Sequence, residues 1–193
     1  MENYKKNLEL LTKNYVYSKE MEHDACGVGL IASTEGKKSR ASVEYGIEAL
    51  KAVWHRGAVD ADGKTGDGAG IHVEIPKDFF IEKIEVTGHD YDNTEICVGM
   101  IFLPRNDYSA QESCKTIVES ELTKNNFSIY GWRQVPVNPK VLGEKALQTM
   151  PEIIQVLFKS NDPNLLDKSL ERKIYETRKK IENKAFEASL NNF

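Results

Sequence analysis

The 193-residue chain lacks the features of disulfide-stabilised and zinc-binding proteins. It has three cysteines, Cys26, Cys97 and Cys114, with no Cys-x-x-Cys pair and no histidine at ligand spacing. An odd number of scattered cysteines argues against a disulfide framework and against a structural zinc site. This cysteine usage is typical of a reduced, cytoplasmic protein, and we expect no metal site.

Long apolar runs and concentrated positive charge are also missing. The apolar run CVGMIFL, at residues 97–103, is far too short to cross a bilayer. The net charge is −4, and the lysines and arginines are scattered among the acidic residues without a basic stripe. Residues 1–25 contain many charges and no apolar segment of signal-peptide length. We therefore expect neither a membrane nor a nucleic-acid partner.

The composition is that of an ordinary globular domain, with 40% hydrophobic and 29% charged residues. Apolar patterning predicts helices at 40–54, 109–125, 143–149 and 164–188. Ser109 followed by Glu112 predicts a capping box at the second of these helices. Strands are predicted at 26–33, 71–76, 94–104, 127–137 and 151–159. Because strands and helices do not alternate strictly, the order favours an α+β fold over a doubly wound sheet.

A glycine-rich loop, HRGAVDADGKTGDGAG, follows the first predicted helix at residues 55–70. Glycine can adopt positive φ and lets the backbone approach a ligand closely. The loop is not a phosphate-binding loop, because it has one residue too many, follows a helix and carries three aspartates. It is not an EF-hand either, since Thr65 and Ile71 stand where glycine and glutamate are needed.

Cys26, in the stretch EHDACGVGLIA, has two interpretations. It is either a small packed residue in a strand or a nucleophile. A thiol with a pKa of about 8.5 needs a base, and the sequence does not show which of the four histidines approaches it. Cleavage before Cys26 would create an α-amino group with a pKa of about 7.7–8.0, which could act as that base. The residues alone leave both interpretations open.

Several ordered stretches resemble a known family. They are CGVGLIA, ALKAVWHRGAVDADGKTGDGAGI, GWRQVPVN, LGEKAL and MPEIIQVLF. Together they resemble the beginning of the large subunit of bacterial glutamate synthase, from about Asn14 onward. That region is a class II glutamine amidotransferase domain with the N-terminal-nucleophile hydrolase fold. The resemblance implies an α+β protein, a four-layer αββα sandwich of antiparallel sheets, with a propeptide at residues 1–25 and the N-terminal part of the domain at residues 26–193.

The resemblance also implies roles for individual residues. Cys26 matches the catalytic nucleophile, with its own free α-amino group as the base after processing. Arg56 matches an arginine beside that cysteine, where a fixed cation would favour the thiolate; its alternative role is a buried structural arginine holding the glycine loop. A pocket loop is implied at His55, Gly57, Gly66, Asp67 and Gly68. Trp132 and Arg133 lie in GWRQVPVN, another stretch that resembles the family sequences. We expect Trp132 to be a packing residue.

The implied reaction is hydrolysis of L-glutamine to glutamate and ammonia through a thioester on Cys26. In the family, the ammonia passes to a synthase domain that aminates 2-oxoglutarate. No cofactor is expected in this chain, and FMN, an iron–sulfur cluster and NADPH, NADH or ferredoxin are implied for the complete enzyme. The implied partners are L-glutamine, the remainder of the amidotransferase domain, the synthase domain and a possible small subunit.

The chain departs from the family at its C-terminal end, which reads AFEASLNNF. The family continues into strands with a substrate-binding arginine and an Asn-Gly oxyanion pair, so we expect a domain that is incomplete at the C-terminus. Loss of one oxyanion donor costs about 10²–10³ in rate. We expect weak or no activity from this chain alone. The alternative function is that of a structural or binding fragment from a split or truncated gene.

Overall fold

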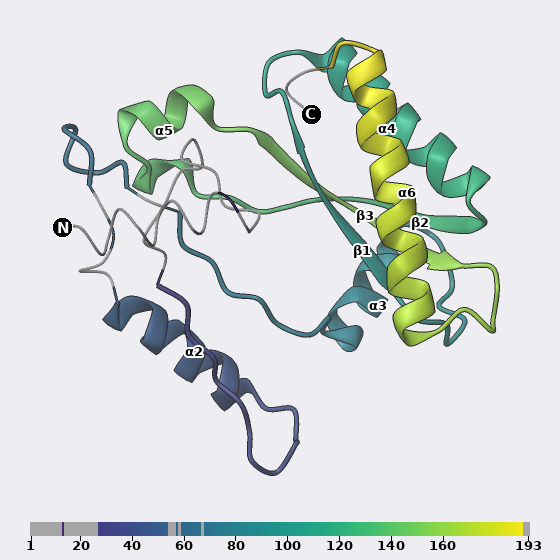
Figure 1. The fold of residues 1–193 in the computed structure, drawn as a ribbon, viewed down its shortest axis with the longest axis horizontal. Helices are drawn as coiled ribbons and strands as arrows, with labels where there is room; N and C mark the ends of the chain where they lie inside the picture. The colour runs from purple at the N-terminus through teal and green to yellow at the C-terminus, as the bar shows by residue number, and fades with distance from the viewer. Residues whose placement is uncertain (1–12, 14–26, 54–56, 58, 67, 191–193) are drawn as a thin grey trace. The chain divides into compact units, whose positions relative to one another are not determined.

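The computed structural model describes residues 13, 27–53, 57, 59–66 and 68–190, and Figure 1 shows its ribbon. The chain divides into two compact units. One comprises residues 1–58 and 67–71, and the other comprises residues 59–66 and 72–193. Among the described residues, no helix combines the length and hydropathy of a bilayer-spanning segment.

The second unit is built on an antiparallel sheet of three strands. These are β1 (Cys97–Leu103), β2 (Phe127–Gln134) and β3 (Glu152–Ser160), in the order β1-β3-β2. The central strand β3 is the most buried of the three, as expected for a strand paired on both sides. Three predicted strands and the α+β class are thereby confirmed.

Helices α4 (Tyr108–Lys124) and α6 (Asp167–Glu187) cover one face of the sheet. Val118 and Leu122 of α4 and Leu170 of α6 pack with alternate residues of the strands. The strand residues in this cluster are Cys97, Phe127, Val156 and Phe158. This face holds most of the buried core, and the long predicted helices at its surface are confirmed.

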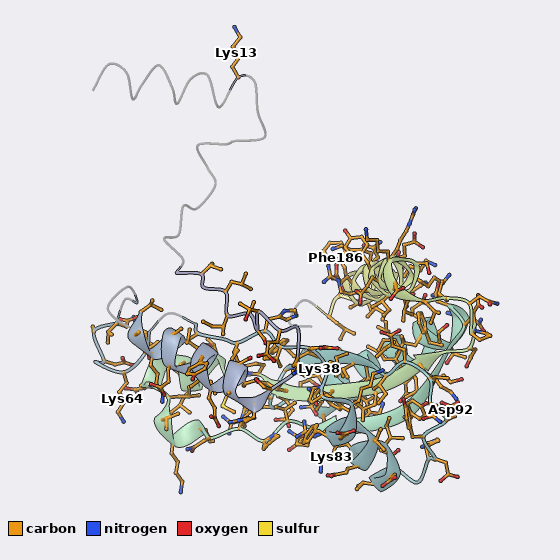
Figure 2. All side chains as sticks on the ribbon, turned by 90° about the horizontal axis from the view of Figure 1, so that it is seen from below. Lys13, Lys38, Lys64, Lys83, Asp92 and Phe186 are labelled. Atoms are coloured by element: carbon orange, nitrogen blue, oxygen red, sulfur yellow. The ribbon has the colours of Figure 1, made fainter. Side chains whose placement is uncertain are left out.

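Helix α3 (Lys77–Val86) packs on the opposite face, as Figure 2 shows with Lys83 on α3 and Phe186 on α6. Its buried residues Phe80 and Ile84 meet Leu157 and Tyr130. A bulge in β2 at Tyr130 permits this contact, because Ile129 and Gly131 oppose consecutive residues of β3. Gly131 has φ +150°, and an ideal Cβ there would lie 2.7 Å from Thr87 Cγ2, so the bulge needs glycine.

The remaining elements are short or belong to the other unit. Helix α5 (Glu144–Thr149) follows a 3₁₀ turn at Pro139–Val141 in the second unit. Helix α2 (Arg40–Ala52) lies in the first unit, and Ser39 caps it by accepting a hydrogen bond from the Ser42 N–H at 3.2 Å. The predictions of helices at 40–54 and 143–149 are thus confirmed.

Two strand predictions are wrong for their described residues. Residues 27–33 are a short apolar run and residues 71–76 alternate between apolar and polar side chains, but neither segment forms a strand. A strand is stable only when a neighbour takes its backbone hydrogen bonds, and these segments have no such neighbour in the described chain. Sequence reasoning also omitted α3, whose helical apolar pattern is confined to ten residues.

The expected capping box at Ser109 is also wrong. Helix α4 begins one residue before it, and Asp107 is the N-cap. The Asp107 carboxylate accepts a hydrogen bond from the Ala110 N–H at 2.9 Å. A carboxylate at this position satisfies an otherwise unpaired N–H and interacts well with the helix dipole, so it displaces the serine as the cap.

Candidate active site

The predicted site residues divide into two groups. Cys26, His55, Arg56 and Asp67 lie outside the residues that the structure describes. The glycines of the pocket loop, Gly57, Gly66 and Gly68, are described and exposed. The mutual geometry of Cys26 and Arg56 therefore remains a prediction.

Described neighbours of these residues meet at α2 in the first unit. An ideal Cβ on Gly27, the residue after Cys26, would lie 3.9 Å from Val53 Cγ2. Val53 is the C-cap of α2 and precedes Arg56 by three residues. At the middle of the helix, an ideal Cβ on Gly46 would lie 3.0 Å from Ile71 Cδ1. Helix α2 thus packs against Ile71, which follows the glycine loop, and Gly27 lies near Val53, the C-cap residue of the helix.

The glycine loop contains a small hairpin at residues 59–66, which we call the 59–66 hairpin. Val59 and Gly66 pair as an antiparallel bridge at its base. The Asp60 N–H donates to the Thr65 carbonyl at 2.7 Å, and the Gly63 N–H donates to the Asp60 carbonyl at 2.9 Å. Gly63 adopts φ +68°, which glycine tolerates best. The loop is therefore an ordered turn between its two ends.

The hairpin is fastened to the start of α5 through charged and packing contacts within the second unit. The Lys145 ammonium donates to both oxygens of Asp60, at 2.9 and 2.7 Å. The Asp62 carboxylate lies against the start of α5, since an ideal Cβ on Gly143 would lie 2.5 Å from Asp62 Oδ2. Gly143 is buried directly against the hairpin, since an ideal Cβ there would lie 2.1 Å from Thr65 Oγ1. We call Asp60, Asp62, Thr65, Gly143 and Lys145 the hairpin clamp.

Asp62 also organises the hairpin from within. Its carboxylate accepts hydrogen bonds from the Thr65 hydroxyl and from the backbone N–H groups of Lys64 and Thr65, at 2.5, 2.9 and 2.7 Å. The Thr65 hydroxyl, followed by these N–H donors, holds the pKa of Asp62 well below its usual range. The hairpin aspartates thus bind N–H and O–H groups of the protein itself. Within the described residues, no group of three His, Cys, Asp or Glu side chains is placed to hold a metal.

The two described cysteines are poor nucleophiles. Cys97 and Cys114 are both buried. Burial raises the pKa of the Cys97 thiol to about 12, with Glu95 and Glu171 adding to the effect. Burial also raises the pKa of Cys114. Because the thiolate is the reactive form, both thiols are inert at neutral pH.

A second polar cluster, which sequence reasoning missed, surrounds Asp92 (Figure 2). Asp92 pairs with the Lys159 ammonium and accepts hydrogen bonds from the hydroxyls of Tyr130 and Thr94, at 2.9 and 2.7 Å. Lys159, followed by Thr94, holds the pKa of Asp92 well below its usual range. Burial raises the pKa of Tyr130. These groups satisfy one another, so the cluster fastens the loop before β1 to the sheet.

Trp132 and Arg133 take packing positions in β2. Trp132 lies against the core beneath α4, and its indole N–H donates to Glu119 Oε1 at 2.7 Å. Arg133 donates to Gln155 Oε1 at 2.7 Å and lies 5.1 Å from the Phe79 ring centroid. The expectation that Trp132 is a packing residue is confirmed.

The hairpin clamp joins two stretches that the sequence comparison had singled out separately. One is the glycine loop, and the other is LGEKAL, which supplies Gly143 and Lys145. Both stretches resemble sequences of the same family. Their resemblance to the same family was the one feature of the sequence that linked the two stretches. The contact itself joins residues 85 positions apart, so no local pattern predicts it.

Comparisons with known proteins agree with this resemblance. The family described as glutamine amidotransferases class-II matches residues 26–193. The glutamate synthase [NADPH] large chain of Azospirillum brasilense is 50% identical over 190 residues, which are 98% of this chain and 12% of that protein. Ferredoxin-dependent glutamate synthase 1 of Arabidopsis thaliana is 40% identical over 162 residues, 83% of this chain and 10% of that protein.

A cyanobacterial relative gives the same result. Ferredoxin-dependent glutamate synthase 2 of Synechocystis is 37% identical over 167 residues, 86% of this chain and 11% of that protein. The chain thus spans about a tenth of the length of the relatives it matches. Because the family match covers the chain from Cys26 to Phe193, the chain belongs to the class II glutamine amidotransferases.

Proposed function

We propose that this chain carries the glutamine-hydrolysing site of a glutamate synthase. The observation that carries the proposal is the family match, which begins at Cys26 itself. A second observation supports it, because burial makes Cys97 and Cys114 inert and leaves Cys26 as the one cysteine suited to be a nucleophile. Residues 1–25 are then a propeptide, and their removal exposes Cys26 as the first residue.

In the proposed reaction, the free α-amino group of Cys26 takes the thiol proton. The sulfur then attacks the γ-carboxamide carbon of glutamine and forms a tetrahedral intermediate. The protonated amine returns the proton to the departing nitrogen, the C–N bond breaks and ammonia leaves. Water, deprotonated by the same amine, hydrolyses the thioester to glutamate and free thiol. Nucleophile and base reside on one residue, so little of the geometry depends on the rest of the fold.

Arg56 and the pocket loop are the proposed support of this site. A guanidinium stays charged at all relevant pH values, so Arg56 would favour the thiolate over the thiol. His55, Gly57, Gly66, Asp67 and Gly68 would form the pocket wall. The packing of Ile71 against Gly46 of α2 supports this assignment, because it places the segment after the pocket loop beside the helix that precedes Arg56.

The family relationship extends the proposal beyond this chain. We assign the ammonia product to a synthase domain that aminates 2-oxoglutarate, and FMN, an iron–sulfur cluster and NADPH, NADH or ferredoxin to other parts of the complete protein. A small subunit is a further proposed partner, and the location is cytoplasmic. For the complete domain we propose the four-layer αββα sandwich, in which the described sheet with α4 and α6 would be one sheet-and-helix pair.

The test is made on the complete protein with its natural propeptide. Mass spectrometry of the mature N-terminus should give a chain that begins at Cys26, and glutamine hydrolysis should accompany it. Cys26→Ala should remove at least about 10³-fold of kcat, because the reaction loses its nucleophile. A protein that hydrolyses glutamine while every chain retains Met1 would refute the proposed base.

A further inference from the structure

The hairpin clamp holds the middle of the glycine loop by its side chains and its backbone. Lys145 binds Asp60 through both carboxylate oxygens, and an ideal Cβ on Gly143 would lie 2.5 Å from Asp62 Oδ2. An ideal Cβ on Gly143 would also lie 2.4 Å from the Thr65 backbone nitrogen. Side chains larger than hydrogen are therefore excluded at Gly143 unless the hairpin backbone moves.

The hairpin is covalently continuous with the proposed pocket wall. Gly66 is itself a pocket-loop residue, and Gly68 follows it by two residues. Two peptide units span at most about 7 Å, so the position of Gly66 limits where Gly68 can lie. Val59 pairs with Gly66, so both ends of the loop start from the base of one anchored hairpin.

We propose that Lys145 and Gly143 are positioning residues for the glutamine pocket, which they serve by fixing the 59–66 hairpin. The inference rests on the proposed function, because it concerns the pocket loop of that same site. Neither residue is assigned contact with the substrate. Their effect passes through Gly66, and misplacement of a binding wall by about 1 Å can cost as much as 10²-fold in rate.

This role can be separated from a role in folding. The side chains of Lys145 and Asp60 are 63% and 35% exposed, and exposed ion pairs contribute little to stability. Lys145→Met should therefore leave the melting temperature nearly unchanged while it loosens the hairpin. Lys140→Met is the matched control, because Lys140 is an exposed lysine of the adjoining turn, and its ammonium has no ion pair among the described residues.

The experiment uses the complete protein and two readouts. The first is kcat and KM for glutamine hydrolysis. The second is alkylation of Cys26 by a chloroketone analogue of glutamine, compared with alkylation by iodoacetamide, which needs no pocket. Lys145→Met should lower kcat/KM and slow chloroketone labelling by about tenfold, while iodoacetamide labelling stays unchanged. Lys145→Arg should restore most of both, since it keeps the charge.

Asp60→Asn gives a second route to the same conclusion. If the pair acts as a unit, the double variant Asp60→Asn/Lys145→Met should be no worse than Lys145→Met alone. Additive losses would overturn the clamp, as would equal losses in Lys145→Met and Lys140→Met. Gly143→Ala should reproduce the labelling defect. Because the added methyl group can also unfold the hairpin locally, the conclusion rests on the lysine variants.

Failure of the proposed function gives a different result. A wild-type protein that neither hydrolyses glutamine nor reacts with the chloroketone at Cys26 would overturn the proposed function and the inference that rests on it. A wild-type protein that does both, with Lys145→Met unchanged, would overturn the positioning role alone.

Discussion

At the scale of single residues, the environment of each cysteine distinguishes the buried structural thiols from the proposed nucleophile. Cys97 lies in the core cluster beneath α4 and α6, and a pKa of about 12 leaves roughly one thiolate in 10⁵ at pH 7. We predict that iodoacetamide labels the native protein at Cys26 and not at Cys97 or Cys114. All three should react in denaturant. Mass mapping of the alkylated peptides measures this, and native labelling at Cys97 would contradict it.

Asp92 should make stability depend on pH. Its folded pKa is lowered mainly by Lys159, so its contribution is present above the unfolded pKa of about 3.9 and is lost as pH falls through the folded value. Asp92→Asn should cost about 1 kcal/mol at pH 6, a modest figure because the carboxylate is 42% exposed. Urea unfolding should show this difference shrinking below about pH 3.9.

Asp90→Asn is the control for that experiment. Asp90 is an exposed neighbouring carboxylate that has no hydrogen bond or ion pair among the described residues. Lys159 has a raised pKa because of its bond to Asp92, so the same pair is also lost as pH rises through the folded pKa of the lysine. An Asp92→Asn variant whose deficit grows at acid pH would contradict the assignment.

At the scale of elements, α4 shows how neighbouring residues compete for one cap. Both Asp107 and Ser109 are plausible N-caps by residue type, and the Asp107 carboxylate accepts the hydrogen bond from Ala110. Asp107→Ala should lower the free energy of unfolding by about 1 kcal/mol. Ser109→Ala should be nearly neutral, because Ser109 is exposed and its carbonyl, not its hydroxyl, bonds Ser113. Equal losses in the two variants, measured by urea unfolding, would contradict this assignment.

Elements with self-contained patterns could be predicted from the sequence, and elements that need partners could not. The apolar stripes of α4 and α6 and the buried run of β3 identify those elements locally. Residues 27–33 are apolar enough for a strand, but a strand also needs a neighbouring strand to pair with. The residues of the segment itself do not show whether such a neighbour exists. The hairpin clamp depends on the tertiary contact of α5 with a distant loop, which has no local signature.

The candidate site shows the same division. Cys26, Arg56 and the pocket loop could be named because long ordered motifs tie them to a family, and none of these assignments came from periodicity. Gly143 and Lys145 lie in LGEKAL, yet nothing in that stretch indicates what they touch. Thr65 leaves no room for a side chain at Gly143, and this contact depends on the folding of a distant loop onto α5.

At the scale of the whole molecule, the exposed apolar surface predicts association of the 193-residue chain when it is produced alone. Met100 and Phe102 of β1 are 49% and 52% exposed, and Val98 of the same strand packs in the cluster with α3. In the described sheet, β1 is an edge strand without charge or proline, and no other described strand pairs with its outer hydrogen-bonding groups. An apolar groove of about 490 Å³ lies beside it, lined by Ile101, Ile174 and Ile181 among others.

We expect light scattering to find concentration-dependent oligomers of the chain. Met100→Lys should reduce association, because a charge on the edge opposes pairing with a second strand. Thr123→Lys is the control, since it adds the same charge at an exposed site on α4. A wild-type chain that stays monomeric at all concentrations would show that the exposed face does not drive association.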